Sequence, residues 1–267
     1  MTDTSQTTDK PMVSYELEGD IALLGLDRPV KRNAIDDRTI HDLAAAVDRA
    51  GREAKVGIIF GHGDHFSAGL DLAEHAERTP FEGVMHSRLW HGIFDRIERG
   101  PIPFLSALHG ATVGGGLELA TSTHIRVADE TAFFALPEGQ RGIFVGGGGS
   151  VRIAKLIGAA RMADMMLTGR TISADKAERI NLVQYVVPKG EALAEAKVLA
   201  GRIANNAPLS NFAITHALPR IQDVAHDDGL FFESLMAAFT QTSPEAVARL
   251  RAFLEKRAAR LDAPRDK

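Results

Sequence analysis

Short apolar runs alternate with helical patterns over most of this chain, and this alternation limits the folds that it can adopt. The chain opens with a hairpin signal, in which an alternating stretch turns at Gly19-Asp20 into a second apolar run. The runs "VGIIFG" at 56–61 and "FLSAL" at 104–108 have the composition of buried strands. Between them, a helical pattern ends before Pro101, because proline has no backbone N–H to donate. Strands that alternate with helices predict an α/β fold.

The last part of the chain has a different pattern. From about Glu191 onward no strand run follows, and at "TSPEA" Ser243 and Pro244 predict a capped helix start. The chain from Glu191 onward therefore forms a region of helices. This region has an apolar face that is too extensive for a solvated appendage, so we expect it to dock on the core or on another subunit. The residues of this face are Leu230, Phe231, Phe232, Leu235, Met236 and Phe239.

The composition is that of an ordinary globular protein. The 267 residues are 45% hydrophobic and carry a formal net charge of −4, without the basic field that nucleic-acid binding needs. No apolar run approaches the roughly 20 residues of a membrane span, and the start "MTDTSQTTDKPM" lacks the apolar stretch of a signal peptide. We therefore expect a cytoplasmic protein without nucleic-acid or membrane partners, with a disordered tail at 1–12, a core at 13–205 and a helical region at 206–267.

The chain contains no cysteine, which excludes disulfides, thiolate nucleophiles and cysteine-ligated zinc. His62 and His65 have a spacing that metal ligands can have. The glycine-rich loop around them offers no obvious third ligand, so we interpret them as solvated histidines and expect no metal site.

The segment "HGATVGGGLELATSTHI" at 109–125 places three glycines just ahead of the carboxylate of Glu118. Gly114–Gly116 lie between an apolar strand and a predicted helix. There, glycine lets a ligand approach the backbone, and the free N–H groups of the helix start favour an anion or a developing oxyanion. Alternatively, the glycines permit close packing of strand and helix, and Glu118 only complements the helix dipole.

Two further segments favour a catalytic interpretation. "HFSAGLDL" at 65–72 places a second small-residue turn after a strand, and "LPEGQRG" at 136–142 supplies a second carboxylate, Glu138. A backbone oxyanion hole needs one N–H from each of two loops, and addition or removal of water needs one group to accept a proton and another to donate one. A second glycine cluster, "GGGGS" at 146–150, imitates a dinucleotide-binding turn only loosely, since no strong strand precedes it.

The chain resembles the crotonase (enoyl-CoA hydratase/isomerase) superfamily in the order and spacing of "LDRPVKRNAID", "FSAGLDL", "HGATVGGGLELA", "LPEGQRGI" and "MLTGRTISADKAERINLVQYVV". The resemblance is close from about Tyr15 to Val187 and looser in the helical region. It implies a spiral of β-β-α units that forms two roughly perpendicular sheets. It also implies a C-terminal helical region that packs chains into a homotrimer or a hexamer.

The resemblance implies site residues as well. It assigns the two oxyanion N–H groups to Leu70 and Gly115, and the two catalytic acids to Glu118 and Glu138. Hydratases of the family have glutamate at both positions. This implies addition of water across the 2,3 double bond of an enoyl-CoA thioester, as in fatty acid metabolism, without a metal or redox cofactor. Because Glu118 lies in the first turn of a helix, whose dipole favours its ionised form, we predict that it is the base and that Glu138 is the acid.

For the coenzyme A part of the substrate, the resemblance implies contacts at the A-G-x-D turn and at nearby basic side chains. The residues implied are Ala68, Gly69, Leu70, Asp71, Lys31 and Arg32, and Lys256 and Arg257 are a further candidate pair. Lys31 and Arg32 have an equally simple interpretation as part of a solvated turn.

Two departures from the family leave the substrate open. "STHI" at 122–125 stands where A-C-D-I is common, and "FVGGGGSVR" at 144–152 replaces I-P-G-A-G-G-T-Q-R beside the acyl pocket. The length of the acyl chain and a preference for aliphatic or aromatic groups are therefore not predicted. The alternative functions are double-bond isomerisation, an aryl-enoyl-CoA hydratase-lyase step, and a non-catalytic acyl-CoA-binding or RNA-binding member of the fold. The pair of glutamates argues against acyl-CoA binding alone, and the net charge argues against RNA.

Overall fold

The computed structural model describes residues 10–74, 78–255 and 257. The chain forms two compact units that divide after Ala204. All the described strands belong to the first unit, and the second unit is helical. Most of the predicted tail, residues 1–9, lies outside the described residues, as does Lys256.

The first unit is built on a six-stranded sheet. The chain's opening hairpin forms as predicted, since its first two strands are antiparallel, whereas all other neighbours in this sheet are parallel. Parallel neighbours need long crossover connections, which helices supply here, so the prediction of an α/β fold is confirmed. In spatial order the strands are β1 (Val13–Glu18), β2 (Ile21–Leu26), β3 (Val56–Gly61), β4 (Phe104–Leu108), β6 (Ile125–Asp129) and β9 (Tyr185–Val187).

A second, three-stranded sheet contains β5 (Ala111–Val113), β7 (Phe133–Ala135) and β8 (Ile172–Ser173). The chain passes from the first sheet to the second at Gly110, between β4 and β5. Gly110 has a φ of +53°, and a Cβ atom there would lie 2.1 Å from the Asp64 carbonyl oxygen. Only glycine fits such a position, so Gly110 determines where the chain can turn from the first sheet into the second.

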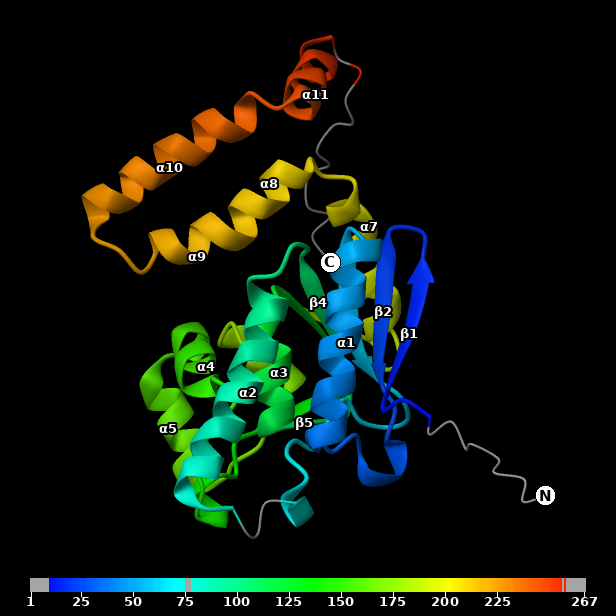
Figure 1. Cartoon of the computed structure of the whole chain (residues 1–267), viewed down its shortest axis with the longest axis vertical. Helices are drawn as coiled ribbons and strands as arrows, with labels where there is room; N and C mark the ends of the chain where they lie inside the picture. Colours follow the sequence, from blue (N-terminus) through cyan, green and yellow to red (C-terminus); the bar gives the residue numbers. More distant parts are fainter. Residues whose placement is uncertain (1–9, 75–77, 256, 258–267) are drawn as a thin grey trace, which may run out of the picture. The chain divides into compact units, whose positions relative to one another are not determined.

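Helices cover both faces of the larger sheet (Figure 1). On one face, α1 (Asp37–Glu53) and α2 (Pro80–Glu98) share a buried apolar cluster with Leu24, and on the other α7 (Ala192–Ala204) shares one with Leu23. Neighbouring residues of a strand point to opposite faces, which explains why these two leucines belong to different clusters.

The remaining helices of the first unit include α3 and α4, which begin within the two glycine-rich segments. Each residue of α3 is buried, and α3 packs against both α2 and α4. Its position makes the first turn of α3 part of the interior. These elements are α3 (Gly115–Ser122), α4 (Gly149–Ile157), α5 (Ala159–Thr168) and α6 (Ala174–Arg179), with the 3-10 helices η1 (Pro29–Lys31), η2 (Leu72–Glu74) and η3 (Gly139–Arg141).

The second unit consists of α8 (Pro208–Phe212), the π-helical η4 (Ala213–Ala217), α9 (Leu218–Ile221), α10 (His226–Gln241) and α11 (Pro244–Leu254). As predicted, Ser243 caps α11 by accepting a hydrogen bond from the Ala246 N–H, and Pro244 is the first helical residue. The predicted apolar face lies on α10, and within this unit all its members except Met236 are exposed. Among the described residues, no helix has the length and apolar character that crossing a membrane requires.

Candidate active site

A cavity of about 510 Å³ in the first unit is lined by residues of α2 and by the segment from Ile143 to Gly147. Its wall also contains Leu70, Gly115, Glu118 and Glu138. These four residues come from separate segments of the sequence. The fold therefore brings together both predicted N–H donors and both predicted acids.

Two backbone N–H groups lie close together in this wall. Leu70 follows Gly69, which has a φ of +90° and where a Cβ atom would lie 2.5 Å from the Val113 carbonyl oxygen. A Cβ atom on Gly115 would lie 3.3 Å from the Leu70 nitrogen and 2.8 Å from the Trp90 ring. Gly115 begins α3, so its N–H precedes the helix's own hydrogen bonds. The Leu70 N–H has no backbone acceptor within the described chain, so both groups are available to one ligand oxygen.

The second glycine cluster holds the carboxylate of Glu118. This residue is 4% exposed, and its Oε1 accepts hydrogen bonds from the N–H groups of Gly147 and Gly149, each at 2.8 Å. A Cβ atom on Gly147 would lie 3.2 Å from Glu118 Oε2, and one on Gly149 would lie 2.9 Å from Glu118 Cγ. The absence of side chains at these two positions therefore lets the backbone reach the carboxylate.

Sequence reasoning missed this role of "GGGGS". The cluster looked like a loose dinucleotide-binding turn or a wall of the acyl pocket, but it supplies the hydrogen-bond donors of a buried acid. The only signal in the sequence is that a second run of glycines precedes a helix. No local pattern connects it to Glu118, which is 29 residues from Gly147.

Burial raises the pKa of the Glu118 carboxyl, and the N–H groups of Gly149 and Gly147 oppose that rise. The net direction is upward, so the prediction that the helix dipole favours the ionised form misses the larger effect, which is loss of water. The ionised form of Glu118 depends mainly on its hydrogen bonds to the glycine turn.

Glu138 is also buried, but one of its two carboxyl oxygens lacks a donor in the described part of the chain. It is 5% exposed, and its Oε2 has no hydrogen-bond partner among the described residues. Burial raises its pKa from 4.5 to about 7, and the nearby charge of Glu118 adds to the rise. An oxygen that has no donor among the described residues favours the protonated form of Glu138.

Arg152 of α4 supports the glycine turn from the side of α2. Its side chain is 9% exposed and donates a hydrogen bond to the Gly147 carbonyl oxygen at 3.1 Å. It also pairs with Asp95 at 2.6 Å and with Glu98 at 2.8 Å. Although burial raises the pKa of Glu118, the charge of Arg152 is among the effects that lower it. Arg152 thus connects α2 to the turn that holds the acid.

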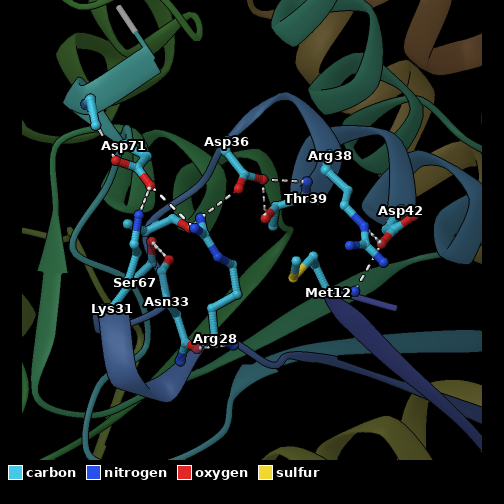
Figure 2. Close-up of polar contacts among 12 residues, drawn as sticks. Met12, Arg28, Lys31, Asn33, Asp36, Arg38, Thr39, Asp42, Ser67 and Asp71 are labelled. Carbon is cyan, nitrogen blue, oxygen red and sulfur yellow. Dashed lines mark hydrogen bonds and ion pairs between the residues drawn. The ribbon is translucent and has the colours of Figure 1, made fainter. Parts of the chain in front are cut away.

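A buried ion-pair network fixes the turn that carries Leu70 (Figure 2). Arg28 bridges two buried carboxylates, at 2.8 Å from Asp36 Oδ2 and 3.2 Å from Asp71 Oδ2. Lys31 lies 3.0 Å from the same Asp71 oxygen, and its hydrogen bond holds the pKa of that carboxyl below its usual range. Two residues predicted to lie near coenzyme A, Asp71 and Lys31, are therefore paired with each other.

The other residues predicted near coenzyme A surround this network. Arg32 is exposed, has a φ of +53°, and its side chain has no ion-pair partner in the described chain. Its carbonyl oxygen accepts a hydrogen bond from the Ala68 N–H, which places the turn at Gly69 beside it. Of the predicted coenzyme A contacts, only Leu70 lines the cavity itself. Arg257 belongs to the second unit and pairs with Glu255.

His62 and His65 are half-buried rather than fully solvated as predicted. His62 Nε2 lies 2.8 Å from Ser14 Oγ, and His65 Nδ1 accepts a hydrogen bond from the Ala111 N–H. They connect their loop to β1 and β5. No group of three or more potential metal ligands occurs among the residues that the structure describes.

Comparison with known proteins identifies related sequences. Residues 16–263 match a family model described as Enoyl-CoA hydratase/isomerase. The chain is 33% identical to the short-chain-enoyl-CoA hydratase of Clostridium acetobutylicum over 248 residues, which cover 92% of this chain and 95% of the relative. It is 32% identical to the 2,3-dehydroadipyl-CoA hydratase of Escherichia coli over 241 residues, which cover 89% of this chain and 93% of the relative.

The fold is likewise similar to solved structures. A Rhodopseudomonas palustris protein with a provisional assignment as an enoyl-CoA hydratase superposes with a TM-score of 0.89. Its sequence is 49% identical, and the match covers 92% of this chain and 95% of that one. The two-sheet α/β architecture expected from the sequence is therefore confirmed.

Replacement of Arg28 tests the network behind the Leu70 turn. Arg28→Ala should lower the free energy of unfolding by about 3 kcal/mol, because it leaves two buried carboxylates without their shared partner. Lys31→Ala removes a side chain that is 54% exposed and should cost less than about 1 kcal/mol. Urea unfolding at pH 7 measures both. Equal, small losses would show that the bridge contributes little.

Replacement of Glu138 tests its raised pKa through stability. The folded state holds this proton more tightly than the unfolded state, so the contribution is complete below pH 4.5 and is lost as the pH rises to about 7. Glu138→Gln cannot ionise and should gain about 1–3 kcal/mol relative to the wild type between pH 5 and pH 8. Chemical unfolding at both pH values gives the difference, with the exposed Glu130→Gln as control. A constant difference would contradict the raised pKa.

Proposed function

The chain belongs to the enoyl-CoA hydratase/isomerase family, and we propose that it hydrates 2-enoyl-CoA thioesters. The proposal rests on one observation: two buried carboxyls that differ in their hydrogen bonding lie on the same cavity wall. Glu118 accepts two backbone hydrogen bonds, whereas Glu138 Oε2 has no partner in the described part of the chain and burial raises the pKa of Glu138 to about 7. Addition of water needs one proton acceptor and one proton donor. A relative named short-chain-enoyl-CoA hydratase, which matches over most of its length, supports the same reaction.

In the proposed mechanism, the thioester carbonyl oxygen accepts hydrogen bonds from the N–H groups of Leu70 and Gly115. Glu118 removes a proton from water while the water oxygen bonds to the β-carbon. The electrons of the double bond move to the carbonyl oxygen, and the enolate is stabilised by the two N–H groups. Glu138 then donates its proton to the α-carbon and leaves a 3-hydroxyacyl-CoA. Proton exchange with solvent restores both carboxyls, so the chain's own groups supply each step.

The coenzyme A part is proposed to lie at the turn formed by Ala68, Gly69 and Leu70. Arg32 is the basic side chain best placed for a phosphate there, because it is exposed and without an ion pair in the described chain. Lys31 is half-exposed and would share its charge between Asp71 and the ligand. Both residues keep their proposed role, with Arg32 as the stronger contact.

Double-bond isomerisation is the main alternative within the family. An isomerase moves one proton between two carbons, which a single acid–base group can do. Hydration requires, in addition, a second buried acid that can donate a proton. The two glutamates therefore favour hydration over isomerisation and over acyl-CoA binding alone.

We also propose that the second unit joins subunits into a trimer or a dimer of trimers. The exposed face of α10 supports this proposal, since Phe231 is 63% exposed and Phe239 is 58% exposed within the single chain. Apolar surface of this extent is typical of a face that a partner covers.

Replacement of the two acids tests the proposed reaction. Glu118→Gln and Glu138→Gln should each lower kcat by roughly 10²- to 10⁴-fold with crotonyl-CoA, because each removes one proton-transfer group. The loss of absorbance of the conjugated enoyl thioester measures turnover, and Glu130→Gln serves as the control. In the wild type, kcat should also fall above about pH 7 as Glu138 loses its proton. Near-normal turnover by either variant would exclude the assignment.

Replacement of Arg152 tests whether it positions Glu118. Arg152→Gln should lower kcat about tenfold through loss of charge-assisted hydrogen bonds, with little change in KM. Removal of the positive charge should also raise the pKa of Glu118, so the acid limb of the pH–rate profile should move to higher pH. Arg161→Gln, on the exposed side of α5, is the matched control. A lower rate with an unmoved acid limb would indicate a structural role alone.

A further inference from the structure

The α2 side of the cavity carries polar residues that the proposed mechanism does not use. His86, Ser87, Arg88 and His91 all line the same cavity as the two acids. Three of them have partners in the described chain. His86 pairs with Asp37, and His91 Nε2 lies 3.4 Å from Ser87 Oγ. Only Arg88 brings a permanent charge.

Arg88 differs from the other charged residues of α2. Among the described residues it makes no ion pair and no hydrogen bond, whereas Arg96 lies 2.7 Å from Asp48 and Asp95 lies 2.6 Å from Arg152. A guanidinium keeps its charge at every physiological pH and presents five donors that match a carboxylate. The cavity therefore has a cation at its wall whose donors are not used inside the protein.

The acids of the cavity do not neutralise Arg88. Glu118 is turned to the glycine N–H groups, and no ion pair joins Arg88 to Glu138 in the described chain. Burial is the main effect that lowers the pKa of His91, and the charges of Arg88 and Arg152 lower it further. The neighbouring His91 therefore stays neutral. Arg88 is thus the one fixed cation among the described residues that line the cavity.

Apolar side chains line the cavity beside this cation. Val84, Arg88 and His91 are spaced i, i+4 and i+7 along α2 and so share one helix face. Val84 and Phe144 are 57% and 68% exposed, and both line the cavity with Ile143. A ligand that fits this wall has an apolar middle and an anionic end.

Building on the proposed hydratase function, we infer that Arg88 selects enoyl-CoA substrates whose acyl chain ends in a carboxylate. The thioester would bind at Leu70 and Gly115, the reacting carbons would lie at Glu118 and Glu138, and the terminal carboxylate would pair with the Arg88 guanidinium. Arg88 is then a specificity residue that takes no part in proton transfer.

The test compares two substrates that differ in the end of the acyl chain. Hydration of 2,3-dehydroadipyl-CoA and of 2-hexenoyl-CoA is measured for the wild type, Arg88→Gln and Arg96→Gln. Arg88→Gln should lower kcat/KM for the carboxylate substrate at least about tenfold, the size expected for hydrogen bonds between charged groups. It should leave 2-hexenoyl-CoA within about twofold, since the same two carboxyls and N–H groups act on it. Arg96→Gln, on the same helix but outside this cavity, should change neither.

Three results would overturn the inference. Equal losses on both substrates would show that Arg88 binds the shared coenzyme A part. Unchanged kcat/KM values for both substrates would show that Arg88 has no role in binding or selection. A wild type that hydrates 2-hexenoyl-CoA but not the carboxylate substrate would refute the inference and leave the proposed function intact, whereas failure on both substrates and on crotonyl-CoA would refute the proposed function itself.

Discussion

The hydrogen bonds from Gly147 and Gly149 to the Glu118 carboxylate are the interaction around which the candidate site is built. A carboxylate at 4% exposure has lost nearly all its water, and without donors its burial would cost several kcal/mol. The donors require glycine, because side chains there would meet Glu118. Arg152 supports this glycine turn and joins the turn to α2. Burial of one acid thus explains a glycine cluster, a buried arginine and two acidic residues of α2.

In the same cavity, the proposed reaction and the contacts to the acyl chain depend on different parts of the structure. The proposed reaction uses the backbone of two glycine turns and the acids Glu118 and Glu138. The apolar wall and the free guanidinium come from α2 and from the segment after Glu138. Trp90 belongs to both parts, since its ring lies against Gly115 while its helix carries Arg88. The position of α2 therefore affects the oxyanion donors as well as the acyl wall.

Those features that depend on nearby residues could be predicted from the sequence. Alternating strands and helices gave the α/β fold, "TSPEA" gave the start of α11, and the resemblance of short segments brought out the four cavity residues. Contacts between distant segments could not be predicted. Arg28 reaches Asp71 across 43 residues, and Gly147 reaches Glu118 across 29, so neither pairing has a local pattern. The rise in the pKa of Glu118 could not be predicted for the same reason, since its burial depends on the packing of α2, α3 and α4.

The use of main-chain N–H groups as the proposed oxyanion donors has an evolutionary consequence. A substitution other than proline changes a side chain but keeps the amide, so residue 70 can remain a donor with a different side chain as long as Gly69 keeps its positive φ. Selection on the proposed reaction would then act on the path of the chain, while selection on the substrate would act on the side chains of α2 and of residues 143–147 that line the cavity. A lineage built in this way can exchange one acyl group for another by changing a few surface-facing residues and keep its chemistry throughout.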